Sequence, residues 1–481
     1  MSERGMSGPS GRQWGAQMTI RPDALRPCGM QQREIGAFPN VAGQASGEPA
    51  ARRVNIESFP PVLLADATWL GTLAAARDLG AHGVKVTLAS DRWVAPARWS
   101  RHVAQTVSCP SSRDAAGFLA WLLRFGAKQP GHVLYPTSDD VAWLVAAHRD
   151  VLSGRFHLYT PPVECLVRVL DKVRLVEDAR AVGLDVPESI VPCDEHDAER
   201  RGRELSFPLY VKPRAHLFGS GGGKGIRVDQ PAALLRSWLA QRRASQFDAD
   251  VLDRVPDLCL PMLQGFVFAS ERIYTVDGFV DETGELYASL ACVKLLQRPR
   301  GSGPGIVFEH AEVDPAVDQG LRRLFKATGF RGVFDAEFIE HDTRKLLIDI
   351  NPRFYNHMAF ETDRGLHLPW LAYLAATGNR EALKEEVEKA NRAVKVSHRA
   401  YVHRLQTSLL LAAQRLARSM SDEDQLRWRR WMLDNLGSAM DPVRMADDPA
   451  PSVAEAAMEA LNFMRHPRAS LRSLLRAPSA N

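Results

Sequence analysis

The sequence predicts an α/β domain, then an α+β core, then a helical C-terminal extension. Between residues 60 and 160, short apolar runs alternate with Ala- and Leu-rich helical stretches, which is typical of a mostly parallel sheet. Between 171 and 380, short β-branched runs and helices are separated by turn-rich loops. Beyond Lys384 the chain is rich in Ala, Leu, Arg and Glu, which favours helices.

Four segments follow from these shifts in composition. Residues 1–57 mix Gly, Pro, Ser, Gln and Arg without apolar periodicity, so a disordered leader is expected there. An N-terminal α/β domain is expected over 58–165, a two-lobed α+β domain over 166–380 and a helical extension over 381–481.

Composition and charge narrow the classes of function that the sequence supports. The 481 residues are 45% hydrophobic and 25% charged, as in a globular protein that buries a core. The net charge of +4 is small for this length, so small-molecule chemistry is expected and nucleic-acid binding is not. The six cysteines form no C-x-x-C pair, which favours reduced thiols in a cytoplasmic protein, and no apolar run predicts a transmembrane segment.

The first α/β units come directly after residue 60. Residues 62–65 form an apolar run, a helical stretch follows, and 84–89 is a second strand. Residues 132–136 are a further strand, and the helix of 139–148 begins at a cluster of capping residues. Only Gly71 stands where a dinucleotide-binding turn needs three spaced glycines, so a dehydrogenase is excluded.

An acidic hairpin is the most informative feature. In the strand of residues 346–351, alternation places Asp349 and Asn351 on one face, and a hairpin return places Glu337 opposite Asp349. These hard oxygen donors favour Mg²⁺ or Mn²⁺. The alternative is a solvated hairpin face, which the surrounding Phe, Ile and Leu disfavour. Asp335 is interpreted as a surface or hinge residue.

A glycine-rich loop could approach phosphate oxygens with its backbone N–H groups. Its residues are Gly219, Ser220, Gly221, Gly222, Gly223 and Lys224. It lacks the Gly-Lys-Ser/Thr of a P-loop, and alone it could equally be a flexible surface loop. Lys212 ends the apolar strand before it, where it could reach a phosphate or extend into solvent. Lys172, which opens a helix after Asp171, is by itself an ordinary helix-surface residue.

The order of these motifs resembles the ATP-grasp superfamily, in particular its carboxylate–amine ligase branch related to carbamoyl-phosphate synthetase and biotin carboxylase. The resemblance covers roughly residues 60–380. The motifs are Asp171-Lys172, Gly183-Leu184-x-Val186-Pro187, Phe207-Pro208-Leu209-Tyr210-Val211-Lys212-Pro213, the glycine loop, Glu337 and Asp349-x-Asn351-Pro352-Arg353.

The resemblance implies an ATP-grasp fold preceded by a pre-ATP-grasp βαβ domain, and it implies roles for individual residues. Lys172, Lys212 and the glycine loop would hold ATP phosphates, and Glu337, Asp349 and Asn351 would hold Mg²⁺. Arg353, Lys294 and, second to it, Arg298 would contact the transferred phosphoryl group or the substrate carboxylate. The adenosine would lie against Gln264, Phe266, Val267 and Glu271. Asp349 stands where the family usually has Glu, and Gly265 where it usually has an acidic residue.

Three further residues near these motifs are not assigned to the ATP site. Cys292 lies in an apolar strand, so a buried core thiol is favoured over a nucleophile. His310 and His357 receive no role.

The function expected from the resemblance is an ATP- and Mg²⁺-dependent ligase that joins a small carboxylate to an amine, and a homodimer is a further expectation. One alternative is a catalytically weak ATP-binding sensor or assembly protein of the same fold. Another gives the basic C-terminal helices a docking role, against which an ordinary solvated helical face is preferred.

Overall fold

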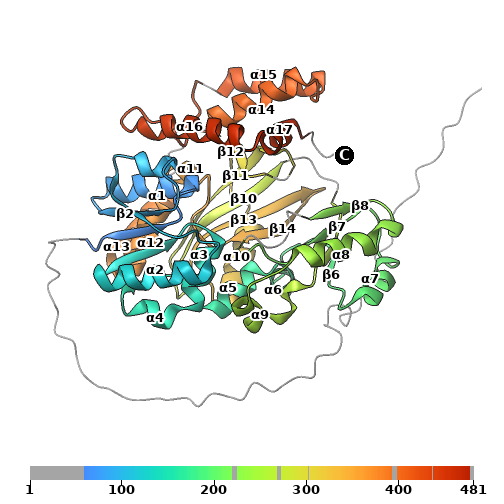
Figure 1. Ribbon diagram of the computed structural model, residues 1–481, viewed down its shortest axis with the longest axis horizontal. Helices are drawn as coiled ribbons and strands as arrows, with labels where there is room; N and C mark the ends of the chain where they lie inside the picture. Colours follow the sequence, from blue (N-terminus) through green and yellow to red (C-terminus); the bar gives the residue numbers. More distant parts are fainter. Residues whose placement is uncertain are drawn as a thin grey trace, which may run out of the picture.

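Three sheets organise the chain in this computed structural model (Figure 1). The structure describes residues 59–218, 225–267, 272–301, 303–392, 398–435 and 437–476. Within them, no helix combines the length and apolar character needed to cross a membrane.

The first sheet is parallel, with strand order β3-β2-β1-β4-β5. Its strands are β1 (Val62–Ala65), β2 (Val86–Ser90), β3 (Val103–Ser108), β4 (His132–Pro136) and β5 (Phe156–His157). Its connections are α1 (Leu70–Ala81), η2 (Pro96–Trp99), α2 (Ala115–Lys128), α3 (Asp139–Ala147) and α4 (Arg149–Ser153). Every residue of β1, β2 and β4 is buried, as expected of parallel strands covered on both faces.

The second sheet is antiparallel and carries the acidic hairpin. Its order is β14-β13-β10-β11-β12-β15. Its first five strands are β10 (Ile273–Val280), β11 (Tyr287–Gln297), β12 (Gly305–Ala311), β13 (Gly332–His341) and β14 (Arg344–Asn351). The helices around it are α5 (Val163–Leu170), α6 (Lys172–Ala181), α10 (Pro315–Thr328), α11 (Ala359–Asp363), α12 (Leu368–Ala376) and α13 (Arg380–Arg392). Helices α5 and α6 contact β14, and α12 contacts β10 and β13.

The third sheet is small and antiparallel, with order β6-β9-β7-β8. Its strands are β6 (Ser189–Ile190), β7 (Leu209–Lys212), β8 (Ile226–Val228) and β9 (Met262–Gly265). Helices α7 (Glu195–Gly202), α8 (Leu234–Ala244) and α9 (Ala249–Arg254), with turns η3 (Pro231–Ala233) and η4 (Pro256–Cys259), accompany it. It packs its own core around Trp238 and lies to one side of the six-stranded sheet (Figure 1).

The C-terminal extension is not purely helical. Strand β15 (Ala400–Val402) pairs with β12 and becomes the edge of the six-stranded sheet. Three residues are too few to show a strand period, so the sequence did not predict this strand. Helices α14 (Arg404–Leu416), α15 (Asp422–Asn435), α16 (Ala450–Arg465) and α17 (Pro467–Leu475) follow and lie together across the β11–β12 side (Figure 1). Leu474 of α17 is buried against the rest of this group, so the tail has a packed face.

A buried ion pair joins the extension to the first helix. Arg77 Nε donates to Asp448 Oδ2 at 2.9 Å, and the same guanidinium binds the carbonyl oxygens of Pro442 and Val443. Ser100 Oγ also donates to Asp448, at 2.7 Å. Burial raises the pKa of Asp448, but the hydrogen bonds that it accepts outweigh burial, so the net shift is downward. The extension is therefore anchored by a charge that stays ionised in the folded state.

Candidate active site

One face of the six-stranded sheet gathers the polar side chains. Residues directly opposite one another on antiparallel strands share a face, and alternation repeats that face every second residue. The register places on one face Thr275 and Asp277 of β10, Cys292 and Lys294 of β11, Asp335 and Glu337 of β13, and Asp349 and Asn351 of β14.

The two carboxylates of the acidic hairpin each hold a lysine from a different element. Glu337 pairs with Asp349 across β13 and β14. Lys294 Nζ lies 2.6 Å from Glu337 Oε1, and Lys172 Nζ, at the start of α6, lies 2.6 Å from Asp349 Oδ1. Burial lowers the pKa of Lys294, but Glu337 and Asp335 outweigh burial and raise it, so the ammonium stays charged.

Asp335 is buried at the site, so its interpretation as a surface or hinge residue was wrong. It lies opposite Asn351, whose Nδ2 donates to Asp335 Oδ2 at 2.9 Å. Asn351 Oδ1 in turn accepts from Arg353 Nη2 at 3.0 Å, and Arg353 Nε donates to Asp139 Oδ1 at 2.9 Å. Strand alternation from Glu337 places Asp335 on the same face, so the sequence pattern could have identified Asp335 as a site residue.

The third sheet holds the residues expected near adenosine. Lys212 Nζ donates to Gln264 Oε1 at 2.6 Å, and Gln264 Nε2 donates to Ser189 Oγ at 3.2 Å. Phe266 lies beside Tyr210, with ring centroids 5.3 Å apart. Lys212 and Gln264 are thus together, and Phe266 and Val267 follow directly after the end of β9. Gly219, Ser220, Gly221, Gly222, Gly223, Lys224 and Glu271 lie outside the described residues.

Arg298 does not lie with Lys294 and the hairpin carboxylates, in contrast to the expectation. Its Nη2 lies 2.5 Å from Glu459 Oε1 of α16, and its Nη1 bonds Gln406 of α14. The register of β11 becomes irregular after Lys294, so the regular alternation of the strand does not extend to Arg298. Arg298 therefore fastens the C-terminal helices.

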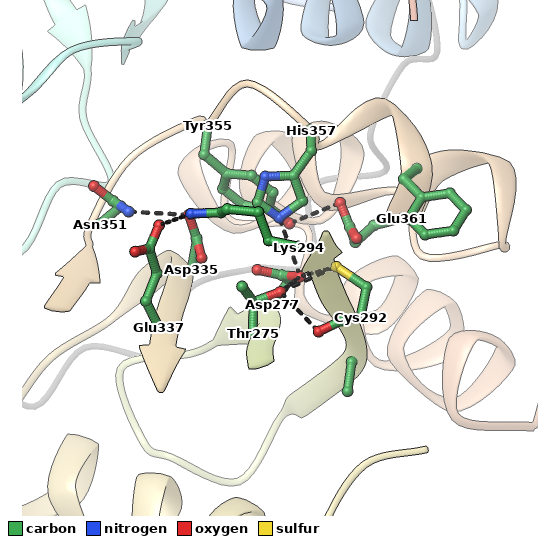
Figure 2. Close-up of polar contacts among 12 residues, drawn as sticks. Thr275, Asp277, Cys292, Lys294, Asp335, Glu337, Asn351, Tyr355, His357 and Glu361 are labelled. Carbon is green, nitrogen blue, oxygen red and sulfur yellow. Dashed lines mark hydrogen bonds and ion pairs between the residues drawn. The ribbon is translucent and has the colours of Figure 1, made fainter. Parts of the chain in front are cut away.

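A buried group beside Lys294 was not predicted from the sequence (Figure 2). Asp277, His357 and Glu361 meet there, because the loop after Arg353 and helix α11 fold back over the sheet. Burial raises the pKa of Asp277 to about 6 and that of Glu361 to about 7. Burial lowers the pKa of His357, which favours a neutral imidazole. Asp277 lies two residues after Thr275 on β10, and Thr275 lies opposite Glu337, so both side chains share the face of the hairpin carboxylates. No local sequence pattern indicates that His357 or Glu361 joins them.

A crevice of about 460 Å³ opens beside Arg353. It lies at the carboxyl ends of β1 to β4 and is lined by Asp66, Arg92, Arg113 and Asp139, among others. Strand order reverses beside β1, and such a switch point is where open α/β sheets bind ligands. The crevice therefore joins the first domain to the polar face of the sheet.

Comparisons with known proteins agree with this architecture. No family model matches the chain. It is 23% identical over 194 residues to the carbamoyl phosphate synthase large chain of Vibrio vulnificus, covering 40% of this chain and 17% of that protein. It is 33% identical over 124 residues to the D-alanine–D-alanine ligase of Stutzerimonas stutzeri, covering 25% of this chain and 38% of that one. The chain thus spans well under half the length of the curated relatives that it matches.

Solved structures give broader coverage. A biotin carboxylase complex with an ATP analogue from Campylobacter jejuni has a TM-score of 0.53 at 15% identity, over 66% of this chain and 71% of that one. N5-carboxyaminoimidazole ribonucleotide synthetase from Thermus thermophilus has a TM-score of 0.51 at 18% identity, over 66% and 78%. The biotin carboxylase domain of Hydrogenobacter thermophilus 2-oxoglutarate carboxylase, solved as a dimer with MgADP and bicarbonate, has a TM-score of 0.53 at 14% identity, over 66% and 69%.

The chain has the ATP-grasp fold, and the resemblance drawn from its motif order is confirmed. Its curated relatives and structural neighbours are ATP-grasp enzymes of the carboxylate–amine ligase type. The residue roles implied by that resemblance stay predictions.

Proposed function

We propose that this protein is an ATP- and Mg²⁺-dependent ligase that activates a carboxylate as an acyl phosphate and joins it to an amine. The observation that carries the proposal is the pairing of Glu337 with Asp349, each bound to a lysine of a different element. These four charges, three on the sheet face and one from the start of α6, are suited to a polyphosphate and a cation.

The donor set fits magnesium. Glu337 and Asp349 offer carboxylate oxygens, and Asn351 offers an amide oxygen on the neighbouring position of the same face. Mg²⁺ prefers such oxygen ligands together with water and phosphate. When bound, the ion neutralises phosphate charge.

The basic residues then bind the phosphates. Lys172 and Lys294 are held by the same carboxylates that would ligate the cation, so they already lie next to its site. Lys212 comes from the small sheet and approaches from the nucleotide side. Arg353 lies between Asn351 and the crevice, where it would contact both the γ-phosphate and the substrate carboxylate.

The crevice is the proposed substrate site. Arg92 and Arg113 would bind a carboxylate there, whereas Asp66 and Asp91 would bind a cationic amine. A lining with both signs of charge fits zwitterionic substrates such as amino acids.

The reaction proceeds in two steps. A carboxylate oxygen of the substrate attacks the γ-phosphorus of ATP, and the bond from that phosphorus to the ADP oxygen breaks. The acceptor amine loses one proton to solvent, its neutral nitrogen attacks the acyl carbon, inorganic phosphate leaves, and the nitrogen gives up a second proton. The chain supplies charge and position for both steps and no covalent nucleophile.

The test is a screen of carboxylic acid and amine pairs for ADP release. Glu337→Gln and Asp349→Asn should each lower kcat by about 100-fold or more, as loss of a group that stabilises transition-state charge does. Glu312→Gln is the matched control, because that carboxylate is 94% exposed and pairs with His310 rather than with the hairpin.

Full turnover in either hairpin variant contradicts the metal assignment. If the protein binds ATP and no acid and amine pair gives ADP, it is a nucleotide-binding protein without ligase activity. Sedimentation of the purified chain tests the homodimer, which stays a prediction.

A further inference from the structure

A closed cluster of four different metal-binding side chains lies beneath Lys294. One ligand atom from each of Asp277, Cys292, His357 and Glu361 lies within 4.8 Å of the other three. All four residues are at most 4% exposed. We infer that these residues bind one zinc ion, or a divalent transition metal of similar preference, at a site separate from the magnesium hairpin.

The fold brings these donors together from four places. Asp277 and Cys292 project from adjacent strands β10 and β11 on the same sheet face. His357 comes from the loop after β14, and Glu361 from α11. Figure 2 shows Asp277, Cys292 and His357 converging on one point. His357 Nε2 lies 3.3 Å from Asp277 Oδ2, and Cys292 Sγ lies 3.6 Å from the same oxygen.

These spacings suit a tetrahedral metal. Bonds of about 2.0–2.3 Å to zinc place neighbouring ligand atoms roughly 3.3–3.8 Å apart. The measured contacts to Asp277 are already near that range, so a metal needs only small shifts of side chains. Thiolate and imidazole ligands favour zinc over magnesium, which selects oxygen.

Two buried aspartates lie directly opposite each other on β10 and β13, namely Asp277 and Asp335, and neither has all of its carboxyl oxygens hydrogen-bonded. Oδ1 of each carboxyl group has no hydrogen-bond partner among the described residues. Two carboxyl groups can bond to each other only when one holds a proton. A buried carboxylate without a proton or a cation is costly, so the site calls for positive charge.

A zinc ion balances the cluster. Asp277, Glu361 and a Cys292 thiolate bring three negative charges, while Zn²⁺ and Arg364 bring two and one positive charges. Arg364 Nη2 donates to Glu361 Oε1 at 2.8 Å, so this positive charge is in direct contact with the cluster. Binding displaces the thiol proton of Cys292, which passes to solvent.

The surrounding groups orient these ligands as the outer partners of a metal site do. Thr275 Oγ1 donates to Asp277 Oδ2 at 2.9 Å, and Tyr355 OH donates to Glu361 Oε2 at 3.1 Å. The His357 ring stacks on Phe308, with centroids 4.3 Å apart. Because the cluster is closed, the metal would fix the loop after Arg353 against the sheet and would not contact substrate.

The experiment measures metal in the purified full-length protein. Elemental analysis should give about one zinc per chain. After exchange with Co²⁺, a thiolate-to-cobalt charge-transfer band should appear. Cys292→Ser should abolish that band, and Asp277→Asn should weaken zinc binding by about 100-fold or more, because loss of even an outer partner costs roughly 10–100-fold.

Three controls show whether the signal comes from this cluster. Cys259→Ser removes a partly exposed thiol elsewhere and should leave the band unchanged. His367→Gln alters a second group of candidate ligands, Asp78, His82 and His367, and should also leave it unchanged. Chelation of wild-type protein should lower its unfolding temperature, a readout that does not depend on how any variant folds.

Two outcomes overturn the inference. Absence of bound zinc together with no cobalt band means that Asp277 and Asp335 share a proton and nothing more. Bound zinc that survives Cys292→Ser but is lost in His367→Gln assigns the metal to the other group, which has no thiolate and gives no such band. Neither result bears on the ligase proposal, whose test is ADP release.

Discussion

Replacing Lys172 with Met should change ATP binding and metal binding in opposite directions. Lys172 Nζ lies 2.6 Å from Asp349 Oδ1 at the start of α6. In the nucleotide-bound protein the ammonium would move its interaction from this carboxylate to a phosphate. Lys172→Met removes the phosphate contact and at the same time frees Asp349 for the cation.

The magnitude follows from the two interactions. A hydrogen bond to a charged group contributes about 1.5–3 kcal/mol. Asp349 is 34% exposed, so its pair with Lys172 is screened by solvent and contributes at most about 1 kcal/mol. Subtracting about 1 kcal/mol leaves a net loss in ATP binding of about 0.5–2 kcal/mol, which corresponds to a Kd roughly 2- to 30-fold higher. Without ATP, affinity for the divalent cation should rise by up to about fivefold.

Calorimetry with a non-hydrolysable ATP analogue measures the first effect, and electron paramagnetic resonance of Mn²⁺ measures the second. Lys384→Met is the control, since that side chain is 66% exposed and its ion pair with Glu388 is 4.0 Å long. An unchanged Kd for the analogue, or ATP and Mn²⁺ affinities that fall together, contradicts the proposed exchange of partners.

Three further predictions concern the framework. Asp448→Asn should flatten the pH dependence of stability. The folded-state pKa of Asp448 is lowered, so its carboxylate stabilises the fold above the unfolded pKa of about 3.9, and this stabilisation is lost as the pH falls through the folded pKa. Urea midpoints between about pH 3 and 6 measure this, and exposed Asp447→Asn should not alter the profile. Gly71→Ala should lower the free energy of unfolding by about 1–3 kcal/mol, because the new Cβ would lie 2.5 Å from a backbone carbonyl oxygen. Gly154→Ala is the control, since its Cβ meets no atom within 4 Å, and denaturation midpoints compare the two variants. Arg298→Met should lower stability by about 1–3 kcal/mol by breaking a partly buried ion pair, with KM for ATP unchanged within about twofold. A large rise in KM would instead support a role of Arg298 at the phosphate site.

Local pattern was enough for much of the hairpin. The structure has the expected pair of Glu337 with Asp349, but a β-bulge creates it. Regular pairing from the turn, where His341 lies opposite Arg344 and Phe338 opposite Leu347, would place Glu337 opposite Ile348, and the register shift between Glu337 and Phe338 moves it to Asp349. The helix beginning at Lys172 was predicted from its capping residue, and Asp171 does cap it. These features depend on neighbours within a few residues, so the sequence carries them directly.

Features that depend on distant packing were not predictable in this way. Strand β15 forms only because β12 offers an edge to residues about ninety positions later. Arg298 turns to helices α14 and α16, whose position no local pattern reveals. His357 and Glu361 reach the sheet through a loop and a five-residue helix that fold back over it.

The sequence alone therefore determined the fold class, through the order of its motifs, and which residues within each hairpin strand share a face, since the latter follows from the two-residue period of a strand. The tertiary structure decided which charges meet across elements, namely Lys172 with Asp349, Arg353 with Asp139 and Arg77 with Asp448. It also decided that Asp277, Cys292, His357 and Glu361 share one closed cluster. Such contacts join residues far apart in the chain, and their geometry is set by the packing of sheets and helices rather than by any local preference.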